Sequence, residues 1–366
     1  MGLFGGAAKK RFVGIDLGSS GIKAVELLNE KGRARLMTYG YSQSRSGENL
    51  FSPLERPKEA ADLLVKVCKQ AGIGPVKAVA ALPMASVFSA VISVPREKDE
   101  KHLKEAINVQ VRKLTPMPLE EMITYSTFID PWKHMPKAKD ASKPSDAPSA
   151  DHVRVLVTGT AKSMVQKYLE VFKLAKVELQ AIDTEAFALI RSLVGKDKGT
   201  VLILDVGHTQ TNLSIVDKGV PFLNRSMHVG GAVVTDQIAS QLGISVDQAE
   251  QMKHDLGTSA APGAEGGSTA FLDSLIQPIL HEIRYAFDLY ARMELTESKR
   301  VEKIILTGGS SHLPQIDVAL SRALNLNVYR GDPWARVVVP EALRSVLDEV
   351  GPRLSVAVGL AMREID

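Results

Sequence analysis

The sequence predicts an α/β protein in which two related domains enclose a nucleotide-binding cleft. An apolar strand that runs into Asp-x-Gly and a small polar turn occurs twice, at Asp16-Leu17-Gly18 and at Asp205-Val206-Gly207. The two copies lie roughly half a chain apart, which indicates an internal repeat and therefore two related domains. The length of 366 residues also exceeds that of an ordinary single core.

Composition narrows the class of protein. The hydrophobic fraction of 45% is normal for a globular chain, and the formal net charge is only +3. Because Lys and Arg are interspersed with Asp and Glu, nothing predicts a nucleic-acid-binding surface. The single cysteine, Cys68, excludes an intrachain disulfide, and no apolar run is long enough to span a membrane. We therefore expect a cytoplasmic protein.

The chain begins with a few apolar residues followed by Lys9, Lys10 and Arg11. Such a segment could touch an anionic membrane weakly, or it could be a plain disordered tail. Gly6 occupies the position at which the myristoylation pattern requires Ser or Thr.

The first half of the chain alternates strands and helices. Apolar runs and the turn at Gly18 to Gly21 predict strands near 12–16, 22–28 and 34–41. Pro57 and Gly72 mark the two ends of a helix. Further strands are expected near 77–82, 87–94, 122–130, 153–159 and 177–182, with helices near 97–114, 162–175 and 184–194. The stretch 133–151, rich in Lys, Pro, Ser and Ala, is expected to be a flexible surface loop.

The second half repeats the early pattern and then becomes helical. Strands near 201–205 and 212–216 flank the second Asp-x-Gly turn, and a strand near 301–306 and a closing helix near 354–362 come last. The expected organisation is a flexible tail at 1–10, a first domain at 11–84 and 182–198 with an inserted α+β subdomain at 85–181, and a second domain with a core at 199–227 and 301–366 and a helical subdomain at 228–300.

The first Asp-x-Gly hairpin has the chemistry of a phosphate-binding turn. Gly18, Ser19 and Ser20 would present backbone N–H groups and hydroxyls to one point, and such concave clusters bind phosphate. Asp16 would hold Mg²⁺ through water, because hard cations prefer oxygen ligands. A single Asp-Gly turn is nevertheless a common hairpin connection.

Two more turns make the nucleotide prediction specific. Thr209, Gln210 and Thr211 add polar groups to the second hairpin, which can face the first across a cleft. The turn Gly308-Gly309-Ser310 follows a buried strand and suits close passage of a ribose or α-phosphate. Gly230-Gly231 adds another close-approach turn.

These ordered motifs resemble those of the actin-like ATPase superfamily. The matching residues are Gly14-Ile15-Asp16-Leu17-Gly18-Ser19-Ser20, then Asp205-Val206-Gly207, then Thr307-Gly308-Gly309-Ser310. The stretches 12–27, 113–120 and 357–361 further resemble the PilM family of cytoplasmic type IV pilus assembly proteins. The resemblance covers about residues 11–363 and implies an actin-like ATPase fold with an FtsA-like insertion in the first domain.

The resemblance implies ATP and Mg²⁺ in the interdomain cleft, with Asp16 and Asp205 on the metal side. Glu250 and Lys253 are similar to residues of the adenosine-side helix, although they could equally be a solvated charge pair. Arg284 would cover the base, or it is simply an exposed arginine. The expected nucleotide contacts are Asp16, Gly18, Ser19, Ser20, Lys23, Asp205, Gly207, Thr209, Gln210, Thr211, Gly230, Gly231, Glu250, Lys253, Arg284, Gly308, Gly309 and Ser310.

Hydrolysis is the open part of this prediction. Relatives that hydrolyse ATP carry a carboxylate or amide on the helix that links the domains, where it orients the attacking water. Asp183 is the best match to that position, but it could instead cap the helix by accepting an N–H at Glu185 or Ala186. Because aspartate is shorter than the usual Glu or Gln, turnover is expected to be slow or absent.

The resemblance also implies partners. In the PilM family the ATP-bound protein clasps the cytoplasmic N-terminal peptide of PilN, an inner-membrane protein, in a groove beside the inserted subdomain. The segment Lys113 to Leu119 could line that groove because its two prolines favour an extended conformation, or it could be a simple helix stop. We therefore expect an adaptor that works with other inner-membrane pilus proteins and reaches the membrane only through its partner.

Two other functions stay open at this point. An FtsA-like membrane-associated polymer is disfavoured because no amphipathic anchor helix follows Arg363. A small-molecule kinase of the same superfamily would need a base poised over a substrate hydroxyl, and the motifs offer no acid beyond those already assigned.

Overall fold

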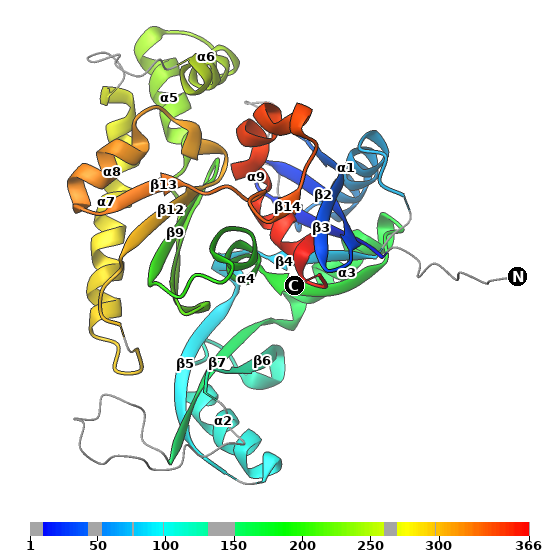
Figure 1. The fold of residues 1–366 in the computed structure, drawn as a ribbon, viewed down its shortest axis with the longest axis vertical. Helices are drawn as coiled ribbons and strands as arrows, with labels where there is room; N and C mark the ends of the chain where they lie inside the picture. The colour runs from blue at the N-terminus through cyan, green and yellow to red at the C-terminus, as the bar shows by residue number, and fades with distance from the viewer. Residues whose placement is uncertain are drawn as a thin grey trace, which may run out of the picture.

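The computed structural model describes residues 10–42, 53–74, 77–97, 99–130, 151–259, 269–296 and 298–365. The predicted tail at 1–10 and the predicted loop at 133–151 lie almost wholly outside these ranges. Figure 1 shows two α/β domains side by side, with a small three-stranded sheet projecting beneath them. This arrangement agrees with the predicted class of two related domains and one insertion.

The first domain is built on a six-stranded sheet with the order β14-β3-β2-β1-β4-β8. The strands β1, β2 and β3 form an antiparallel meander, and β4 and β8 add to β1 in parallel. The strand bounds are β1 Arg11–Gly18, β2 Gly21–Glu30, β3 Arg33–Tyr41, β4 Ala78–Leu82, β8 Leu179–Thr184 and β14 Val337–Val338.

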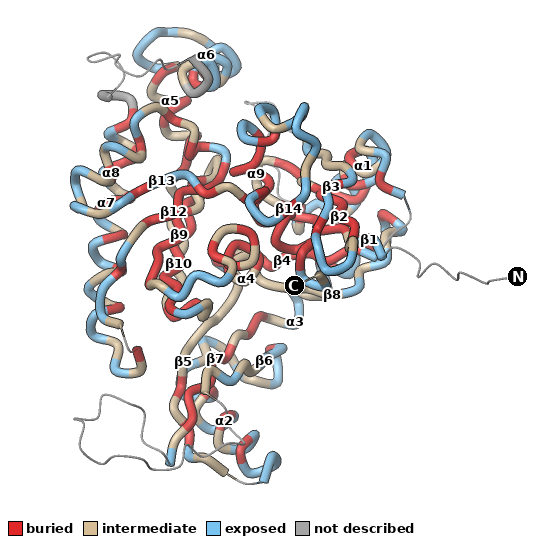
Figure 2. The backbone as a smooth tube through the Cα atoms, in the orientation of Figure 1, coloured by how far each residue is buried: buried red, intermediate tan, exposed pale blue. Residues whose placement is uncertain are grey.

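Helices cover both faces of this sheet. The helices α1 (Pro57–Gln70) and α3 (Lys162–Leu174) pack together over one face, where Leu64, Tyr168 and Phe172 join the core. The last helix, α9 (Arg344–Met362), covers the other face through Leu354 and Val358. Figure 2 shows the buried strands between these helices; the outer face of α1 is exposed, whereas the C-terminal part of α9 is buried on all sides.

The second domain repeats this plan on a five-stranded sheet with the order β11-β10-β9-β12-β13. Its strands are β9 Val201–Val206, β10 Thr211–Asp217, β11 Val220–Met227, β12 Lys303–Thr307 and β13 Asn327–Arg330. The meander β9-β10-β11 corresponds to β1-β2-β3, and β12 lies parallel to β9 as β4 does to β1. Its helices are α5 Gly231–Leu242, α6 Val246–Ser259, α7 Thr269–Ala291 and α8 Ile316–Leu324. The predicted internal repeat is therefore confirmed as a repeat of sheet topology.

The insertion is smaller than the sequence predicts. It consists of a three-stranded sheet, β5 (Phe88–Pro95), β7 (His152–Ala161) and β6 (Met122–Phe128), with α2 (Glu100–Leu114) packed on β5. The short helices η1 (Met84–Ser86) and η2 (Leu119–Glu121) flank these strands. We assigned residues 85–181 to the insertion, but α3 and β8 belong to the first domain because β8 pairs with β4 and α3 packs on α1.

The end of the chain also departs from the predicted division. We assigned 301–366 to the second domain, yet β14 pairs with β3 and α9 packs on β1 and β2 of the first domain. Hydropathy places a helix near 354–362 but does not say which sheet its apolar face covers. The short helix η5 (Glu341–Leu343) leads into α9.

The two domains are joined by two crossing segments. The helix α4 (Glu185–Leu189) continues as the π-helical turn η3 (Ile190–Val194), and α9 passes across it. Gly359 of α9 lies against Ala188, and a Cβ at Gly359 would collide with the Ala188 carbonyl group. Arg191 Nε donates to the Gly359 carbonyl oxygen at 2.8 Å, so the crossing is held by a hydrogen bond as well as by close packing. Within the described ranges, no helix has the length and apolar composition required to cross a bilayer.

Candidate functional site

The first hairpin turns on two residues. Gly18 pairs with Gly21 across the β1–β2 ladder, which leaves Ser19 and Ser20 at the tip. Asp16 lies two residues before this turn and is only 6% exposed. Its Oδ2 atom accepts a hydrogen bond from Lys23 Nζ at 3.0 Å, so a buried ion pair stands directly behind the polar tip.

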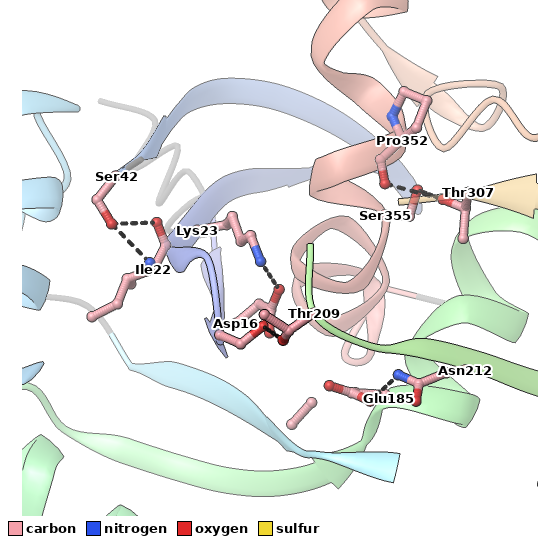
Figure 3. A network of polar contacts seen from close by, with 12 residues as sticks. Asp16, Ile22, Lys23, Ser42, Glu185, Thr209, Asn212, Thr307, Pro352 and Ser355 are labelled. Atoms are coloured by element: carbon pink, nitrogen blue, oxygen red, sulfur yellow. Dashed lines mark hydrogen bonds and ion pairs between the residues drawn. The ribbon is translucent and has the colours of Figure 1, made fainter. Parts of the chain in front are cut away.

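The second hairpin meets the first across the gap between the domains. The Gly207 N–H donates to the Gln210 carbonyl oxygen at 2.9 Å and closes the turn between β9 and β10. Thr209 Oγ1 then lies 2.9 Å from Ser19 Oγ of the other domain. Figure 3 shows Thr209 beside Asp16. The predicted pair of facing hairpins is therefore present, with their hydroxyls in contact.

The third turn, Gly308-Gly309-Ser310, packs against Asp205. Gly308 follows β12 with φ +85°, a conformation that glycine adopts far more readily than other residues. A Cβ at Gly308 would collide with Asp205 Oδ1 and the Val206 carbonyl oxygen. Ser310 Oγ donates to the Gly207 carbonyl oxygen at 2.9 Å, which ties this turn and its short helix η4 (Gly309–His312) to the second hairpin.

These three turns open into one cavity of about 830 Å³ between the domains. Its size suits a nucleotide rather than a single ion or water. Fourteen of the residues that the sequence predicts line it: Asp16, Gly18, Ser19, Ser20, Lys23, Asp205, Gly207, Thr209, Gln210, Glu250, Lys253, Gly308, Gly309 and Ser310.

Asp16, Glu185 and Asp205 are three of the carboxylates that line the cavity, and burial together with neighbouring charge disfavours ionisation of the latter two. Burial, followed by the charges of Asp16 and Asp205, raises the pKa of Glu185 to about 8. Burial also raises the pKa of Asp205 to about 6; Asp16 adds to the increase, while Lys23 opposes it. Among the residues that the structure describes, no group of three or more His, Cys, Asp or Glu side chains is placed to hold a metal ion directly. A divalent cation beside Asp16 and Asp205 would therefore be held partly through water, and its charge would lower both pKa values.

Glu185, not Asp183, lines the cavity. Asp183 instead forms an ion pair with Arg191, with Oδ2 and Nη2 2.5 Å apart, and Arg363 lies 3.6 Å from the same oxygen. Asp183 does not cap the following helix either, because Thr184 is the N-cap and accepts the Phe187 N–H at 3.3 Å. Asp183, which we assigned to hydrolysis, thus pairs with arginines at the place where η3 and α9 cross.

The two residues predicted for the adenosine side form a buried ion pair. Lys253 Nζ lies 2.6 Å from Glu250 Oε2 and also donates to Thr235 Oγ1 at 2.8 Å and to the Gly231 carbonyl oxygen at 3.2 Å. Burial would raise the pKa of Glu250, but the Lys253 ammonium group and its hydrogen bond lower it overall. A solvated surface pair does not describe these side chains, since Lys253 is 8% exposed.

Four of the predicted contacts do not line the cavity. Thr211 is fully buried, and its hydroxyl donates to the Val229 carbonyl oxygen. Gly230 and Gly231 lie behind the second hairpin, where the Gly231 N–H donates to the Gly207 carbonyl oxygen. Arg284 is exposed on α7 and donates to the Ala323 carbonyl oxygen on α8. These residues shape the second domain rather than the wall of the cavity.

Several lining residues were not predicted from the sequence. They include Glu185, His208, Asn212, His254, His312, Arg330 and Arg353. Thr184 offers one signal for Glu185, because a threonine N-cap places the next carboxylate in the first helical turn. His208 and Asn212 lie within or directly after the predicted second hairpin, whereas the remaining residues come from segments with no recognisable spacing, and only the fold brings them to the cavity.

Comparisons with known proteins agree with this geometry. Residues 14–365 match the family described as Type IV pilus assembly protein PilM. A solved PilM-PilN type IV pilus biogenesis complex is similar with a TM-score of 0.74 and 22% identity, covering 97% of this chain and 98% of that chain. The ethanolamine utilization protein EutJ of Carboxydothermus hydrogenoformans has a TM-score of 0.51, 15% identity and coverage of 97% and 90%. MreB 5 of Spiroplasma citri bound to AMPPNP has a TM-score of 0.51, 14% identity and coverage of 96% and 95%.

Proposed function

Because the chain belongs to the PilM family of type IV pilus assembly proteins, we propose that it is an ATP-binding adaptor of the pilus assembly machinery. The observation that carries this proposal is the single cavity between the domains, which is lined by both Asp-x-Gly hairpins and by the third turn. The fold similarity to an AMPPNP-bound MreB supports a nucleotide as the occupant.

Different residues of the cavity would contact different parts of the nucleotide. The backbone N–H groups and hydroxyls at Ser19, Ser20 and Thr209 would hold the phosphates, with Lys23 supplying a positive charge beside them. Asp16 and Asp205 would hold Mg²⁺, which neutralises phosphate charge when it is bound. These groups come from both domains, so bound nucleotide would favour the closed arrangement.

The adenosine end would lie beside Glu250 and Lys253, which line the same cavity. Glu250 and Lys253 are fixed in place by Thr235 and the Gly231 carbonyl oxygen and would meet the ribose and base there. Their mutual hydrogen bonds preorganise them, which reduces the entropy lost when a ligand binds.

Turnover of the bound nucleotide would be slow. Glu185 is the carboxylate in the cavity on the linking segment and would orient a water for attack, a role that we assigned to Asp183 from the sequence. Its Oε2 atom already accepts the Met84 N–H at 2.8 Å and the Asn212 side-chain amide at 3.2 Å. These bonds hold the carboxylate in one place, but they also occupy an oxygen that a base would use.

The partner in this proposal is the cytoplasmic N-terminal peptide of PilN, bound in a groove beside the insertion. The solved relative is a PilM-PilN complex. The segment after α2 has the expected stiffness, since Thr115 (φ −75°, ψ 141°) and Pro118 (φ −55°, ψ 138°) are both extended. The protein would then lie in the cytoplasm, peripheral to the inner membrane through PilN and other pilus machine proteins.

Titration calorimetry with a synthetic PilN N-terminal peptide tests the proposal. The peptide should bind the purified chain at least 10-fold more tightly with Mg·ATP than without nucleotide. A scrambled peptide of the same composition is the matched control. Equal affinity in the two conditions, or no binding with ATP present, would contradict the adaptor role.

A further inference from the structure

In sequence the insertion lies between β4 and α3 of the first domain, but in space one of its sides packs on the second domain. Its strand β5 and its short helix η1 contact β11. Val91 of β5 and Ile129 after β6 pack against the core of the second domain. The insertion, which Figure 1 shows beneath the two domains, therefore packs apolar side chains of β5 and of the segment after β6 on the second domain.

A polar anchor reinforces this packing. Arg154 of β7 is 6% exposed and forms hydrogen bonds to both carboxylate oxygens of Asp130, at 2.8 and 3.0 Å. Its remaining terminal nitrogen, Nη1, donates to the Leu295 carbonyl oxygen of the second domain at 3.0 Å. A buried guanidinium group must keep its hydrogen bonds, so separating the insertion from Leu295 would be costly.

The attachment to the first domain is confined to the base of the insertion. The chain enters at Met84 to Val87 and leaves where β7 meets α3, and Val87 packs on the first-domain core. Thr160 Oγ1 donates to the Ser86 carbonyl oxygen at 2.9 Å, which joins the segment that enters the insertion to the segment that leaves it. Such a narrow base is suited to act as a pivot.

Glu185 connects the nucleotide cavity to the start of the insertion and to β11, the strand of the second domain on which the insertion packs. Its Oε2 atom accepts the N–H of Met84, where the insertion begins, and the side-chain amide of Asn212. Asn212 Oδ1 in turn accepts the hydroxyl of Ser226 at 2.6 Å, and Ser226 lies on β11, the strand that β5 contacts. Figure 3 shows Glu185 and Asn212 facing each other beneath Asp16 and Lys23.

We propose that the insertion moves as one body with the second domain and pivots at its base on the first domain when the cleft closes. The bonds from Glu185 to Met84 and, through Asn212, to Ser226 would transmit the state of the cavity to this movement. The proposal rests on the proposed function, because nucleotide is what closes the cleft. A groove between the insertion and the first domain would then change its width with nucleotide, which gives a peptide bound there a differential affinity.

Pulsed electron–electron resonance between spin labels tests the movement directly. Exposed valines offer one labelling site on each body, V65C on α1, V109C on α2 and V318C on α8, in a C68A background. On addition of Mg·ATP, the 65–109 distance should change while the 109–318 distance stays the same. A change in the 109–318 distance with a constant 65–109 distance, or no change in either distance with ATP bound, would overturn the proposal.

A second arm needs no nucleotide. Ser226→Ala removes the hydroxyl that holds Asn212, and Ser226 is not itself a lining residue of the cavity. It should broaden the 109–318 distance distribution of the nucleotide-free chain. The matched control is Ser321→Ala on α8, which removes a Ser hydrogen bond to the carbonyl oxygen of Leu326, just past the end of that helix, and should leave the distribution as it is.

The two experiments distinguish failure of nucleotide binding from failure of the link through Asn212. If ATP does not bind the wild-type chain, the proposed function is wrong. The 109–318 distance distribution of Ser226→Ala would still test whether Asn212 and Ser226 help to hold the insertion on the second domain. If Ser226→Ala and Ser321→Ala give the same distribution as the parent, the link through Asn212 is overturned even where ATP binds normally.

Discussion

Thr209 and Ser19 face each other across the interdomain cleft with their hydroxyl oxygens 2.9 Å apart. The two residues occupy equivalent tips of the two repeated hairpins, so each domain presents a hydroxyl to the same point. A phosphate placed between the hairpins would replace this neutral contact by hydrogen bonds to charged oxygens, which are the stronger kind.

Thr209→Ala should therefore weaken binding of Mg·ATP. A hydrogen bond to a charged group contributes about 1.5–3 kcal/mol, which corresponds to roughly 10- to 100-fold in Kd. Titration calorimetry measures the change, and Thr209→Ser, which keeps the hydroxyl, should bind within a few-fold of wild type. Equal affinities for the alanine and serine variants would show that this hydroxyl does not touch the nucleotide.

Gly308→Ala should destabilise the protein and impair nucleotide binding together. The residue has φ +85°, and its Cβ would collide with Asp205 Oδ1. Backbone strain of this kind costs about 1–3 kcal/mol, and displacement of Asp205 adds to it. Urea unfolding monitored by circular dichroism should show the loss.

The neighbouring glycine supplies the control. Gly309 has a negative φ and open space where a Cβ would stand, so Gly309→Ala should leave the urea midpoint near that of wild type. Comparable losses at both positions would mean that the turn tolerates neither substitution for a reason other than the contact with Asp205.

The sequence was sufficient for the parts of the site that lie within one hairpin. Spacing alone places Asp16 two residues before its turn, because neighbours along a hairpin keep their relation in any fold. The repeat of this unit also predicted the two related sheets. Partners distant in sequence, such as His312 and Arg330, line the cavity only because β12 and β13 run side by side.

Other features depend on packing choices that a local pattern does not contain. The helix α9 has an apolar face that could cover either sheet. It lies on the first sheet, where it passes so close to Gly14 of β1 that a Cβ there would collide with the Ala357 carbonyl oxygen. Arg284 lies on the exposed side of α7, and one residue of helical phase decides whether an arginine meets solvent or the cavity. The sequence also does not show whether Asp183 or Glu185 faces the cavity, because that depends on the residue at which β8 ends.

Glu185→Ala should abolish slow hydrolysis while ATP remains bound. If this carboxylate orients the attacking water, single-turnover hydrolysis should fall about 100-fold or more. Rapid-quench assays on the ATP-loaded protein measure the rate, and retention on a desalting column checks that ATP stays bound. An unchanged rate would remove Glu185 from the hydrolytic step.

Asp183→Asn is the companion variant. It weakens the ion pair with Arg191 at the crossing of the interdomain segments, so it should lower the urea midpoint without a specific loss of turnover. Turnover that falls in Asp183→Asn and persists in Glu185→Ala would return the role to Asp183.

The nucleotide-free chain should lose stability as the pH rises from about 5 to 8. The folded state raises the pKa of Glu185 from 4.5 to about 8 and that of Asp205 from 3.8 to about 6, chiefly through burial. Between the unfolded and folded pKa values the folded state holds protons that the unfolded state has released, so each pH increment favours unfolding. Urea midpoints measured in EDTA at pH 5, 6, 7 and 8 should decrease, and Glu185→Gln, which cannot ionise, should reduce the decrease above pH 6. If the glutamine variant shows the full wild-type slope between pH 6 and 8, another group titrates there and the raised pKa of Glu185 is refuted.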